Sequence, residues 1–478
     1  MFDVAVIGGG VTGAAVAREL SRYHLSVIVL EKGADVAVGA SKANSAIVHA
    51  GFDCVPGTLK ARLNVRGNAL LRELCPQLSV PFQPIGSLVV AFNDDDVEEL
   101  NRLKARGEAN GVPGLEILSG DEVRRKEPNL SQEIVAALWA PTGAIVCPFE
   151  LTLGMMENAV ENGAVFRRNF EVRGITRDAQ GFTLHSPLGQ VQARFVVNAA
   201  GIRSDEVNAL AGGRPFTILP RKGEYMLLDR STYGTVGTVV FQTPSRWGKG
   251  VLVSPTVHGN LYAGPTAVNT PDKDDTSMTP EGLWYLKKLS RKSVPGIALN
   301  KVITSFAGLR SVVVGRDDFI IGREPEVPGW VNAAGICSPG LSSSPAVAEL
   351  VAEELAAAGL TLTPKADFIA TRRRPKHFAD MTDEQRQQAI AADPRYGRVI
   401  CRCETVTEAE IVAALHSPVP ATTMDGLKRR TRAQAGRCQG GFCGPRLMDI
   451  LCRETGCAYE DITKNGGQSF LVRGKEGL

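Results

Sequence analysis

Long apolar runs and an excess of one charge are both missing from this sequence. No stretch reaches the roughly 20 apolar residues that a membrane-spanning helix needs, and no basic segment precedes the apolar start of the chain. Lys and Arg together number 54 against 51 Asp and Glu, a net charge of +3. This balance excludes a general attraction to nucleic acid or anionic membranes. We therefore expect a cytoplasmic protein with no nucleic-acid partner and no membrane span.

Cysteine pairs of the C-x2-C kind, which four-cysteine zinc sites prefer, are absent among the ten cysteines. Cys401 and Cys403 instead form C-x-C, and Cys438 and Cys443 form C-x4-C. Four thiolates at these spacings can close on one metal centre, and the glycines and arginines around them can stabilise a negatively charged cluster. We favour an iron–sulfur cluster and keep three alternatives open: a zinc site, disulfides, and a basic surface for nucleic acid. The other cysteines are expected to be structural.

The chain begins with the pattern of a dinucleotide site. Val4 to Ile7 form a short apolar run, and Gly8, Gly10 and Gly13 follow as G-x-G-x-x-G. These glycines permit a tight turn, the approach of backbone to a pyrophosphate, and close packing of the helix that follows. The next apolar run ends in Glu31, whose carboxylate can accept a hydrogen bond from a ribose hydroxyl. A glycine turn without a ligand is the alternative.

Two kinds of strand pattern share the remaining chain, which with 478 residues is too long for one ordinary core. Val197 to Gly201 and Val331 to Gly335 both read VNAAG, typical of parallel strands whose carboxyl ends bind ligands. A helix is expected to begin at Ser344, with Pro345 at its first position. Phe216 to Phe306 alternates instead in short strands with glycine and proline turns, as an antiparallel sheet does. We therefore predict an α/β plus α+β fold: a Rossmann-like domain for a dinucleotide, an inserted antiparallel-sheet substrate domain, and a small C-terminal helical iron–sulfur domain.

Two parts of the sequence resemble known families. CRCETVTEAEIVAAL with DGLKRRTRAQAGRCQGGFCGPR, within residues 399–456, resembles the bacterioferritin-associated ferredoxin type of [2Fe-2S] domain found at the end of the catalytic subunit of anaerobic glycerol-3-phosphate dehydrogenase. The first 360 residues resemble the D-amino-acid-oxidase-like FAD oxidoreductases, in the branch of glycerol-3-phosphate dehydrogenase and L-2-hydroxyglutarate oxidase. The motifs that carry this resemblance are IGGGVTG, NSAIVHAG, PGTLKARL, PRKGEY, FAGLR and NAAGICSPGLSSSPAVAE. The resemblance implies FAD and a [2Fe-2S] cluster as cofactors.

The same resemblance assigns the cofactor residues to segments spread over the chain. It places the ADP half of FAD at Gly8, Gly10, Gly13, Glu31 and Lys32, the pyrophosphate side at Ser41, Asn44 and Ser45, and the adenine at Val172. The ribityl chain and flavin ring would lie against Gly201, Gly335, Gly340 and Leu341. The cluster would be held by Cys401, Cys403, Cys438 and Cys443.

Enzymes of this family oxidise a secondary alcohol or amine by passing a hydride to the flavin while a base takes the proton. His49 is our candidate for that base or for a hydrogen bond to the flavin, and a structural role in its loop is the alternative. Arg310 is the candidate to bind a substrate carboxylate or phosphate, because a guanidinium can bind either group bidentately. Arg221, Lys222 and Tyr225 are further candidates for substrate binding.

The sequence leaves the substrate open between a phosphate and a carboxylate. Glycerol-3-phosphate dehydrogenases typically carry an arginine after the histidine loop and a lysine in the last flavin segment, where this chain has Asp53 and a CSPGLSSSP run. The cluster domain nevertheless resembles that of the glycerol-3-phosphate subunit. We therefore expect a FAD-dependent dehydrogenase acting on the CH-OH group of a small anionic substrate, glycerol 3-phosphate or an L-2-hydroxy acid such as 2-hydroxyglutarate. The alternatives are an amine or imino-acid (opine-type) dehydrogenase and a C-terminal module that only binds metal.

A cluster on the same chain as a flavin also implies a partner. A [2Fe-2S] centre can take the electrons of reduced flavin one at a time, so we expect them to pass on to a second flavoprotein or iron–sulfur subunit, which could hold the enzyme at a membrane. We divide the chain into FAD-binding segments 1–80, 146–215 and 306–362, substrate-domain segments 81–145 and 216–305, a linker 363–398, a cluster domain 399–458 and a tail 459–478.

Overall fold

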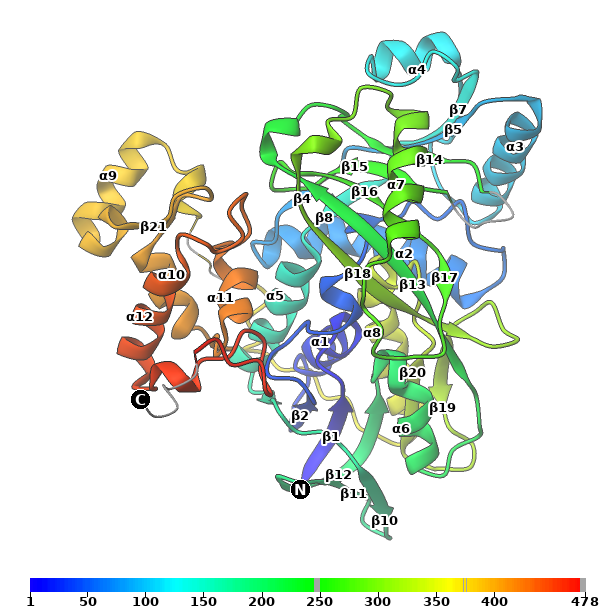
Figure 1. Ribbon diagram of the computed structural model, residues 1–478. Coiled ribbons are helices and arrows are strands. Elements are labelled where there is room, and N and C mark those ends of the chain that lie inside the picture. The colour runs from blue at the N-terminus through cyan, green and yellow to red at the C-terminus, as the bar shows by residue number, and fades with distance from the viewer. Residues whose placement is uncertain (245–249, 373, 375, 473–478) are drawn as a thin grey trace.

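The computed structural model describes all residues except 245–249, 373, 375 and 473–478, so two residues of the predicted linker and the end of the predicted tail lie outside the described part. Figure 1 shows a mainly parallel sheet that contains the N-terminal strand, a second large sheet next to it, and a helical unit at the C-terminal end, set to one side of both. This arrangement confirms the predicted α/β plus α+β fold class.

The central strands of the N-terminal sheet are apolar, and β2, β20 and the end of β1 are buried on both faces. β1 (Phe2–Ile7) pairs in parallel with β2 (Val27–Leu30) and with β12 (Gly189–Asn198). The long β12 changes partner along its length, since its first half pairs antiparallel with β11 (Phe182–Ser186) and its end pairs in parallel with β20 (Trp330–Ala334). The carboxyl ends of β1, β2, β12 and β20 therefore meet at one edge. The sheet also contains β9 (Val165–Arg167), β10 (Gly174–Arg177) and β19 (Ile320–Arg323).

Helices cover this sheet and bring its core together. α1 (Val11–Leu20) contacts both α5 (Pro148–Glu161) and α8 (Gly340–Ala357), and α2 (Leu59–Gln77) lies against α8. Gly67 permits this last approach, because a Cβ at Gly67 would lie 2.1 Å from the carbonyl oxygen of Ser342. The short α6 (Ser204–Leu210) follows β12.

The predicted start of α8 at Ser344 is wrong, because the helix begins at Gly340 and Pro345 lies inside it. Pro345 has no N–H for the carbonyl of Leu341. That carbonyl accepts a hydrogen bond from Ser344 Oγ instead, at 3.0 Å. The hydroxyl thus replaces the missing backbone bond, and the helix continues through the proline.

The second sheet is centred on two long antiparallel strands, β13 (Ile218–Leu228) and β18 (Val302–Val313). They are longer than the short strands predicted for this region, and the sheet extends past residue 305 to Val313. Its other strands are β17 (Val268–Asn269), β16 (Leu261–Gly264), β15 (Leu252–Pro255), β14 (Val239–Gln242), β5 (Ser87–Ala91), β7 (Ala136–Ala140) and β6 (Glu116–Ser119). α3 (Asp94–Ala109), α4 (Gly120–Lys126) and α7 (Pro280–Ser293) flank it, and β3 (Ile47–Val48), β8 (Ala144–Val146) and β4 (Phe82–Gln83) form a small separate sheet.

The C-terminal unit packs its own apolar core, formed by the hairpin β21 (Val399–Cys401) and β22 (Val406–Thr407) and by α10 (Glu408–Leu415), α11 (Met424–Thr431) and α12 (Gly444–Thr455). The segment before it is anchored to the first domain, since buried Arg372 forms an ion pair of 2.5 Å with Glu157 of α5. That segment contains one helix, α9 (Asp383–Ala392). Short 3-10 turns occur at Ala40–Lys42, Gly201–Arg203, Arg230–Thr232, Leu299–Lys301, Phe378–Asp380, Pro394–Gly397 and Tyr459–Asp461.

None of the helices in the described ranges combines the length and the apolar character that crossing a membrane requires.

Candidate active site and cluster site

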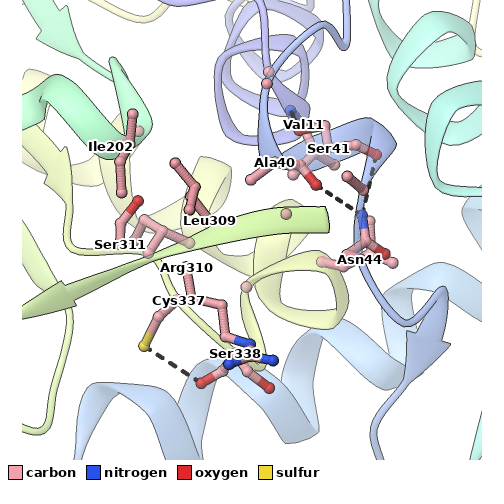
Figure 2. Close-up of a pocket in the computed structure, with 18 of the residues that line it drawn as sticks. Val11, Ala40, Ser41, Asn44, Ile202, Leu309, Arg310, Ser311, Cys337 and Ser338 are labelled. Carbon is pink, nitrogen blue, oxygen red and sulfur yellow. Dashed lines mark hydrogen bonds between the residues drawn. The ribbon is translucent and has the colours of Figure 1, made fainter. Parts of the chain in front are cut away.

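A cavity of about 1150 Å³ lies between the carboxyl edge of the N-terminal sheet and the face of β13 and β18. Figure 2 shows the strand of Leu309, Arg310 and Ser311 crossing it, with Val11 and Ser41 on one side, Cys337 and Ser338 on the other, and Asn44 beyond the strand's end. Most residues predicted for FAD and substrate line this one cavity: Gly8, Gly10, Glu31, Lys32, Ser41, Asn44, Ser45, His49, Val172, Gly201, Arg221, Tyr225, Arg310, Gly340 and Leu341. Gly13, Lys222 and Gly335 are not among its lining residues.

The glycine turn after β1 is shaped by close backbone packing. Gly8 has a φ of +112°, and a Cβ there would lie 2.4 Å from the carbonyl oxygen of Ala199. A Cβ at Gly13 would lie 1.9 Å from the carbonyl oxygen of Gly8, which explains why Gly13 supports the turn without lining the cavity. The turn delivers the N-terminus of α1 to the cavity, where Ser41 Oγ accepts a hydrogen bond of 2.8 Å from the Val11 amide. The cavity therefore meets an end of a helix that favours negative charge.

Glu31 is fixed at the end of β2 by two backbone amides. Its Oε2 accepts from Gly9 N at 2.7 Å and its Oε1 from Gly33 N at 2.6 Å. Burial raises the pKa of this carboxyl, and the two amide hydrogen bonds oppose that rise. The carboxylate thus holds the glycine turn in place while it lines the cavity. A glycine turn, a helix N-terminus and a fixed acid in one elongated space fit the ADP half of FAD.

His49 lies where the N-terminal part of α8 meets β3. Its backbone amide donates to Ser342 Oγ at 2.8 Å, and that hydroxyl donates to the carbonyl of Ile47 at 3.2 Å. Asn68 holds the His49 carbonyl through a hydrogen bond of 3.1 Å. The His49 ring lines the cavity, 5.9 Å from the ring of Phe241. The backbone around His49 is therefore fixed from two sides, which orients the imidazole.

Two arginines lie opposite one another at the cavity wall. Arg221 of β13 and Arg310 of β18 are direct partners in the antiparallel ladder. Arg221 Nε donates to Asn269 Oδ1 at 2.9 Å, and Arg310 Nη2 donates to the Thr266 carbonyl at 3.0 Å. Within the described part of the chain, neither guanidinium is paired with a carboxylate. Like charges directly opposite one another destabilise a sheet, so this pair is suited to an anionic ligand.

Tyr225 and Lys222 have different environments. The Tyr225 ring stacks on Phe306 at 4.8 Å between centroids, and its hydroxyl lies 3.2 Å from Ser45 Oγ at the cavity. Lys222 points to the other face of β13, where its buried Nζ donates to Asp275 Oδ2 at 2.7 Å. The structure therefore gives Lys222 a structural ion pair away from the cavity.

The four predicted cluster cysteines converge in the C-terminal domain. Cys403 Sγ lies 3.8 Å from Cys401 Sγ and 3.9 Å from Cys438 Sγ. Cys401 and Cys443 are buried, whereas Cys438 is exposed. A Cβ at Gly436 would lie 2.5 Å from Cys403 Sγ, so a glycine is needed for the backbone to approach the sulfur.

The thiols of this site favour a bound cation. The amide of Phe442 donates to Cys438 and lowers the pKa of its thiol, and a hydrogen bond from Cys401 lowers the pKa of Cys443. Burial, together with the neighbouring thiol of Cys401, raises the pKa of Cys403 to about 12. The four thiols lie close enough to hydrogen-bond one another, and a bound cation would favour the thiolate form of all four. The donor set fits a [2Fe-2S] cluster held by four cysteines.

Buried arginines join the cluster domain to the loop that lines the FAD cavity. Arg430 Nη1 and Arg429 Nη2 lie 2.7 and 2.8 Å from Asp35 Oδ2. Burial alone would raise the pKa of Asp35, but the two guanidinium groups outweigh it and lower the pKa to about 2. On the other side, Arg432 binds both Glu404, next to Cys403, at 2.8 Å and Asn260, in the turn before β16 of the second sheet, at 3.2 Å.

One polar residue of the cavity was not among the predicted site residues. Lys60 lines the cavity from the first turn of α2 and lies 2.5 Å from Asp317 Oδ1; its place in the PGTLKARL motif was the available signal. His258, in the turn between β15 and β16, lies away from the cavity, with its Nε2 3.1 Å from Glu150 Oε1. Cys452 and Cys457, two of the cysteines expected to be structural, have sulfur atoms 3.8 Å apart.

Comparisons with known proteins match both parts of the chain. Residues 3–354 match the family described as FAD dependent oxidoreductase, and residues 399–453 match the BFD-like [2Fe-2S] binding domain. Together with the donor sets above, these matches confirm the predicted resemblance and the predicted cofactors. The protein binds FAD through the first region and a [2Fe-2S] cluster through the second.

Relatives match over most of the chain. Glycerol 3-phosphate dehydrogenase of Caloramator mitchellensis is 46% identical over 474 residues, which are 99% of this chain and 98% of that protein. Human mitochondrial L-2-hydroxyglutarate dehydrogenase is 29% identical over 411 residues, covering 74% of this chain and 88% of its own length. The structure of L-alpha-glycerophosphate oxidase from Mycoplasma pneumoniae with FAD bound superposes with a TM-score of 0.75 at 33% identity, covering 78% of this chain and 99% of that one.

Proposed function

Since the chain belongs to the family of FAD dependent oxidoreductases, we propose that it is a dehydrogenase that oxidises glycerol 3-phosphate and passes the electrons to its own [2Fe-2S] cluster. The identity of 46% over both domains to a glycerol 3-phosphate dehydrogenase supports this substrate.

The observation that carries the proposal is the pair of Arg221 and Arg310. Their guanidinium groups come from directly opposite positions of β13 and β18 and both line the cavity. A phosphate monoester has a charge near minus two at neutral pH, so it can neutralise both arginines at once. Binding the phosphate here would hold the CH-OH group of glycerol 3-phosphate within the same cavity.

His49 is the residue that we propose as the base. FAD, when bound, supplies the two-electron acceptor for the hydride of the substrate carbinol. The His49 imidazole, on a backbone fixed by Ser342 and Asn68, would accept the proton of the carbinol hydroxyl. Tyr225, stacked on Phe306 and next to Ser45, would exclude water from one side of the substrate.

Anaerobic reduction tests this function. FAD absorbance and the EPR signal of the reduced cluster are followed after addition of glycerol 3-phosphate, L-2-hydroxyglutarate or glycerol. We expect glycerol 3-phosphate to bleach the flavin absorbance and the EPR signal of the reduced cluster to appear afterwards. In the Cys438→Ser variant the flavin should still bleach, but the EPR signal of the cluster should not appear. If L-2-hydroxyglutarate but not glycerol 3-phosphate bleached the flavin, the proposed substrate would be wrong. A bleached flavin beside an EPR-silent cluster in the unmodified enzyme would overturn the electron route.

Oxidation of an L-2-hydroxy acid is the second candidate. Asp53 lines the cavity at the place where glycerol-3-phosphate dehydrogenases typically carry an arginine, and an L-2-hydroxyglutarate dehydrogenase is among the relatives. An amine substrate is separated from both by adding glycine or an imino acid to the same anaerobic assay.

A further inference from the structure

A group of exposed residues surrounds the one cluster ligand that reaches the surface. Cys438 is exposed, and so are Arg402, Arg437, Phe442 and Arg446. We call these five residues the cluster face. Because Cys401 and Cys443 are buried and Cys403 is half-buried, the cluster face is the side from which another protein can come nearest to the iron.

Phe442 forms the centre of the cluster face. Its side chain is 44% exposed although it immediately precedes the buried ligand Cys443. The guanidinium carbons of Arg402 and Arg446 lie 4.5 and 5.3 Å from the centroid of its ring. These cation–π contacts order two cations around an apolar centre at the surface. An aromatic ring flanked by arginines is the composition of an interface hot spot.

Two of the three arginines of the cluster face have no carboxylate partner, whereas Arg437 pairs with Asp229 at 3.1 Å. No Asp or Glu occurs between Ala433 and Met448. Among the described residues, Arg402 and Arg446 form no ion pair with a carboxylate. Arg453, at the other end of α12, is in contrast paired with Glu408 at 2.7 Å and with Glu454 at 2.8 Å. The charges of Arg402 and Arg446 are thus left unpaired beside the cluster, whereas that of Arg453 is neutralised.

We infer that the cluster face docks a small electron-carrier protein with an acidic surface around its own cofactor, such as a flavodoxin. Each encounter moves one electron from the reduced cluster to the oxidised carrier, and no bond between heavy atoms forms or breaks. Opposite charges steer the two proteins together and orient them, and Phe442 supplies a small apolar contact at the centre. This inference rests on the proposed function in one respect, that the cluster receives electrons from the flavin.

Electron transfer to an oxidised acidic flavodoxin tests the inference without the substrate. The cluster of the holoenzyme is reduced with dithionite, and excess reductant is removed. The reduced protein is then mixed with flavodoxin in a stopped-flow instrument, and the rate of electron transfer is measured between 20 mM and 500 mM NaCl. We expect the second-order rate constant to fall steeply with salt. At low salt, Arg402→Glu and Arg446→Glu should each lower it about tenfold, as steering mutations do.

Arg125→Glu is the matched control. Arg125 is exposed on α4, far from the cluster domain (Figure 1), and its substitution changes the net charge by the same amount. It should leave the rate constant unchanged. An unaltered EPR spectrum of each variant's cluster verifies that the ligands are intact, and Phe442→Ala should slow transfer without altering its salt dependence. Rates for Arg402→Glu and Arg446→Glu that equal the rate for Arg125→Glu would overturn the docking face.

The two proposals fail separately. If glycerol 3-phosphate does not reduce the cluster while the dithionite-reduced cluster still transfers electrons through the cluster face, the proposed function fails and the docking surface stands. If the substrate reduces the cluster but the charge reversals change nothing, the docking surface fails alone.

Discussion

At the scale of single residues, Gly223 makes room for its neighbour on the next strand. A Cβ at Gly223 would lie 2.4 Å from Arg310 Nη2, so the absent side chain leaves space for the guanidinium. Arg221, Gly223 and Tyr225 are alternate residues of β13, whereas Lys222 and Glu224 face the other way. Because strand residues alternate between faces, Lys222 and Tyr225, three positions apart, were unsuited to share one site. The alternation of side chains along the strand was readable in the sequence, and it separates Lys222 from the other predicted substrate residues of β13.

Arg310→Leu should lower kcat/KM for glycerol 3-phosphate by about 100-fold, because loss of a charged partner in a closed site costs about 2–5 kcal/mol. Arg310→Lys keeps the charge but loses the bidentate fork, so an intermediate loss is expected. Steady-state kinetics with an artificial electron acceptor measures both variants. Arg214→Leu, a change at an exposed arginine paired with Glu326, is the control. A kcat/KM for Arg310→Leu within twofold of the unmodified enzyme would contradict the phosphate site.

At the scale of elements, short-range patterns were predictable and long-range partners were not. The G-x-G-x-x-G turn depends on the local contact of Gly13 with the Gly8 carbonyl and on the contact of Gly8 with Ala199 at the end of the neighbouring strand β12, and the spacing of its glycines predicted it directly. The start of α8 was misplaced because Ser344 replaces a backbone bond that a proline rule assumes to be lost. The ion pairs of Asp35 with Arg429 and Arg430 join residues nearly 400 positions apart, and no local pattern announces them. The cysteine cluster was predictable because all four ligands lie within one small domain.

Gly67→Ala tests the contact between α2 and α8. The new Cβ would lie 2.1 Å from the Ser342 carbonyl oxygen, so α8 must shift at the residues that hold the His49 backbone. We expect a loss of about 1–3 kcal/mol in stability, as in other overpacked cores, with weaker retention of FAD. Thermal unfolding and FAD release on dilution measure the two effects. Gly296→Ala, where a Cβ meets nothing within 4 Å, should change neither.

Asp35→Asn tests the attachment of α11. Removing this carboxylate leaves two buried guanidinium groups without their partner, a change that typically costs about 3–5 kcal/mol. Calorimetric unfolding and the rate of proteolysis within residues 363–398 should both show a loosened cluster domain. Asp121→Asn, which breaks an exposed Asp–Arg pair, is the matched control and should leave proteolysis unchanged. Equal proteolysis of both variants would contradict the role of Asp35.

The same pair defines a pH dependence. The folded-state pKa of Asp35, about 2, lies below its ordinary value of 3.8, so the unfolded state binds the proton more tightly. Its stabilising contribution is therefore complete above about pH 4 and is lost as the pH falls toward 2. Unfolding measured over this window should show a steeper loss of stability for the unmodified enzyme than for Asp35→Asn.

At the scale of the whole molecule, the C-terminal cluster unit contacts the rest of the chain at two places. Arg432 binds Glu404 of the cluster domain and Asn260, which precedes β16 of the second sheet. Arg437 lies 3.1 Å from Asp229 at the end of β13. The cluster domain therefore touches both the second sheet, whose strands β13 and β18 line the cavity, and the loop after β2 that lines the same cavity. Polar contacts on two sides thus fix the C-terminal unit against the rest of the chain.

The loop containing Asp35 gives this attachment a thermodynamic form. It joins Glu31 and Lys32 to Ser41, all of which line the FAD cavity, while Asp35 itself is held by the cluster domain. FAD binding and docking of the cluster domain both order this loop, so each should favour the other. Thermodynamic linkage requires FAD to strengthen docking by the same factor by which docking strengthens FAD binding. Removal of FAD should accordingly speed proteolysis within 363–398, and Asp35→Asn should weaken FAD binding by the same factor by which FAD slows that proteolysis. The two cofactors are then coupled in assembly, whether or not an electron ever passes between them.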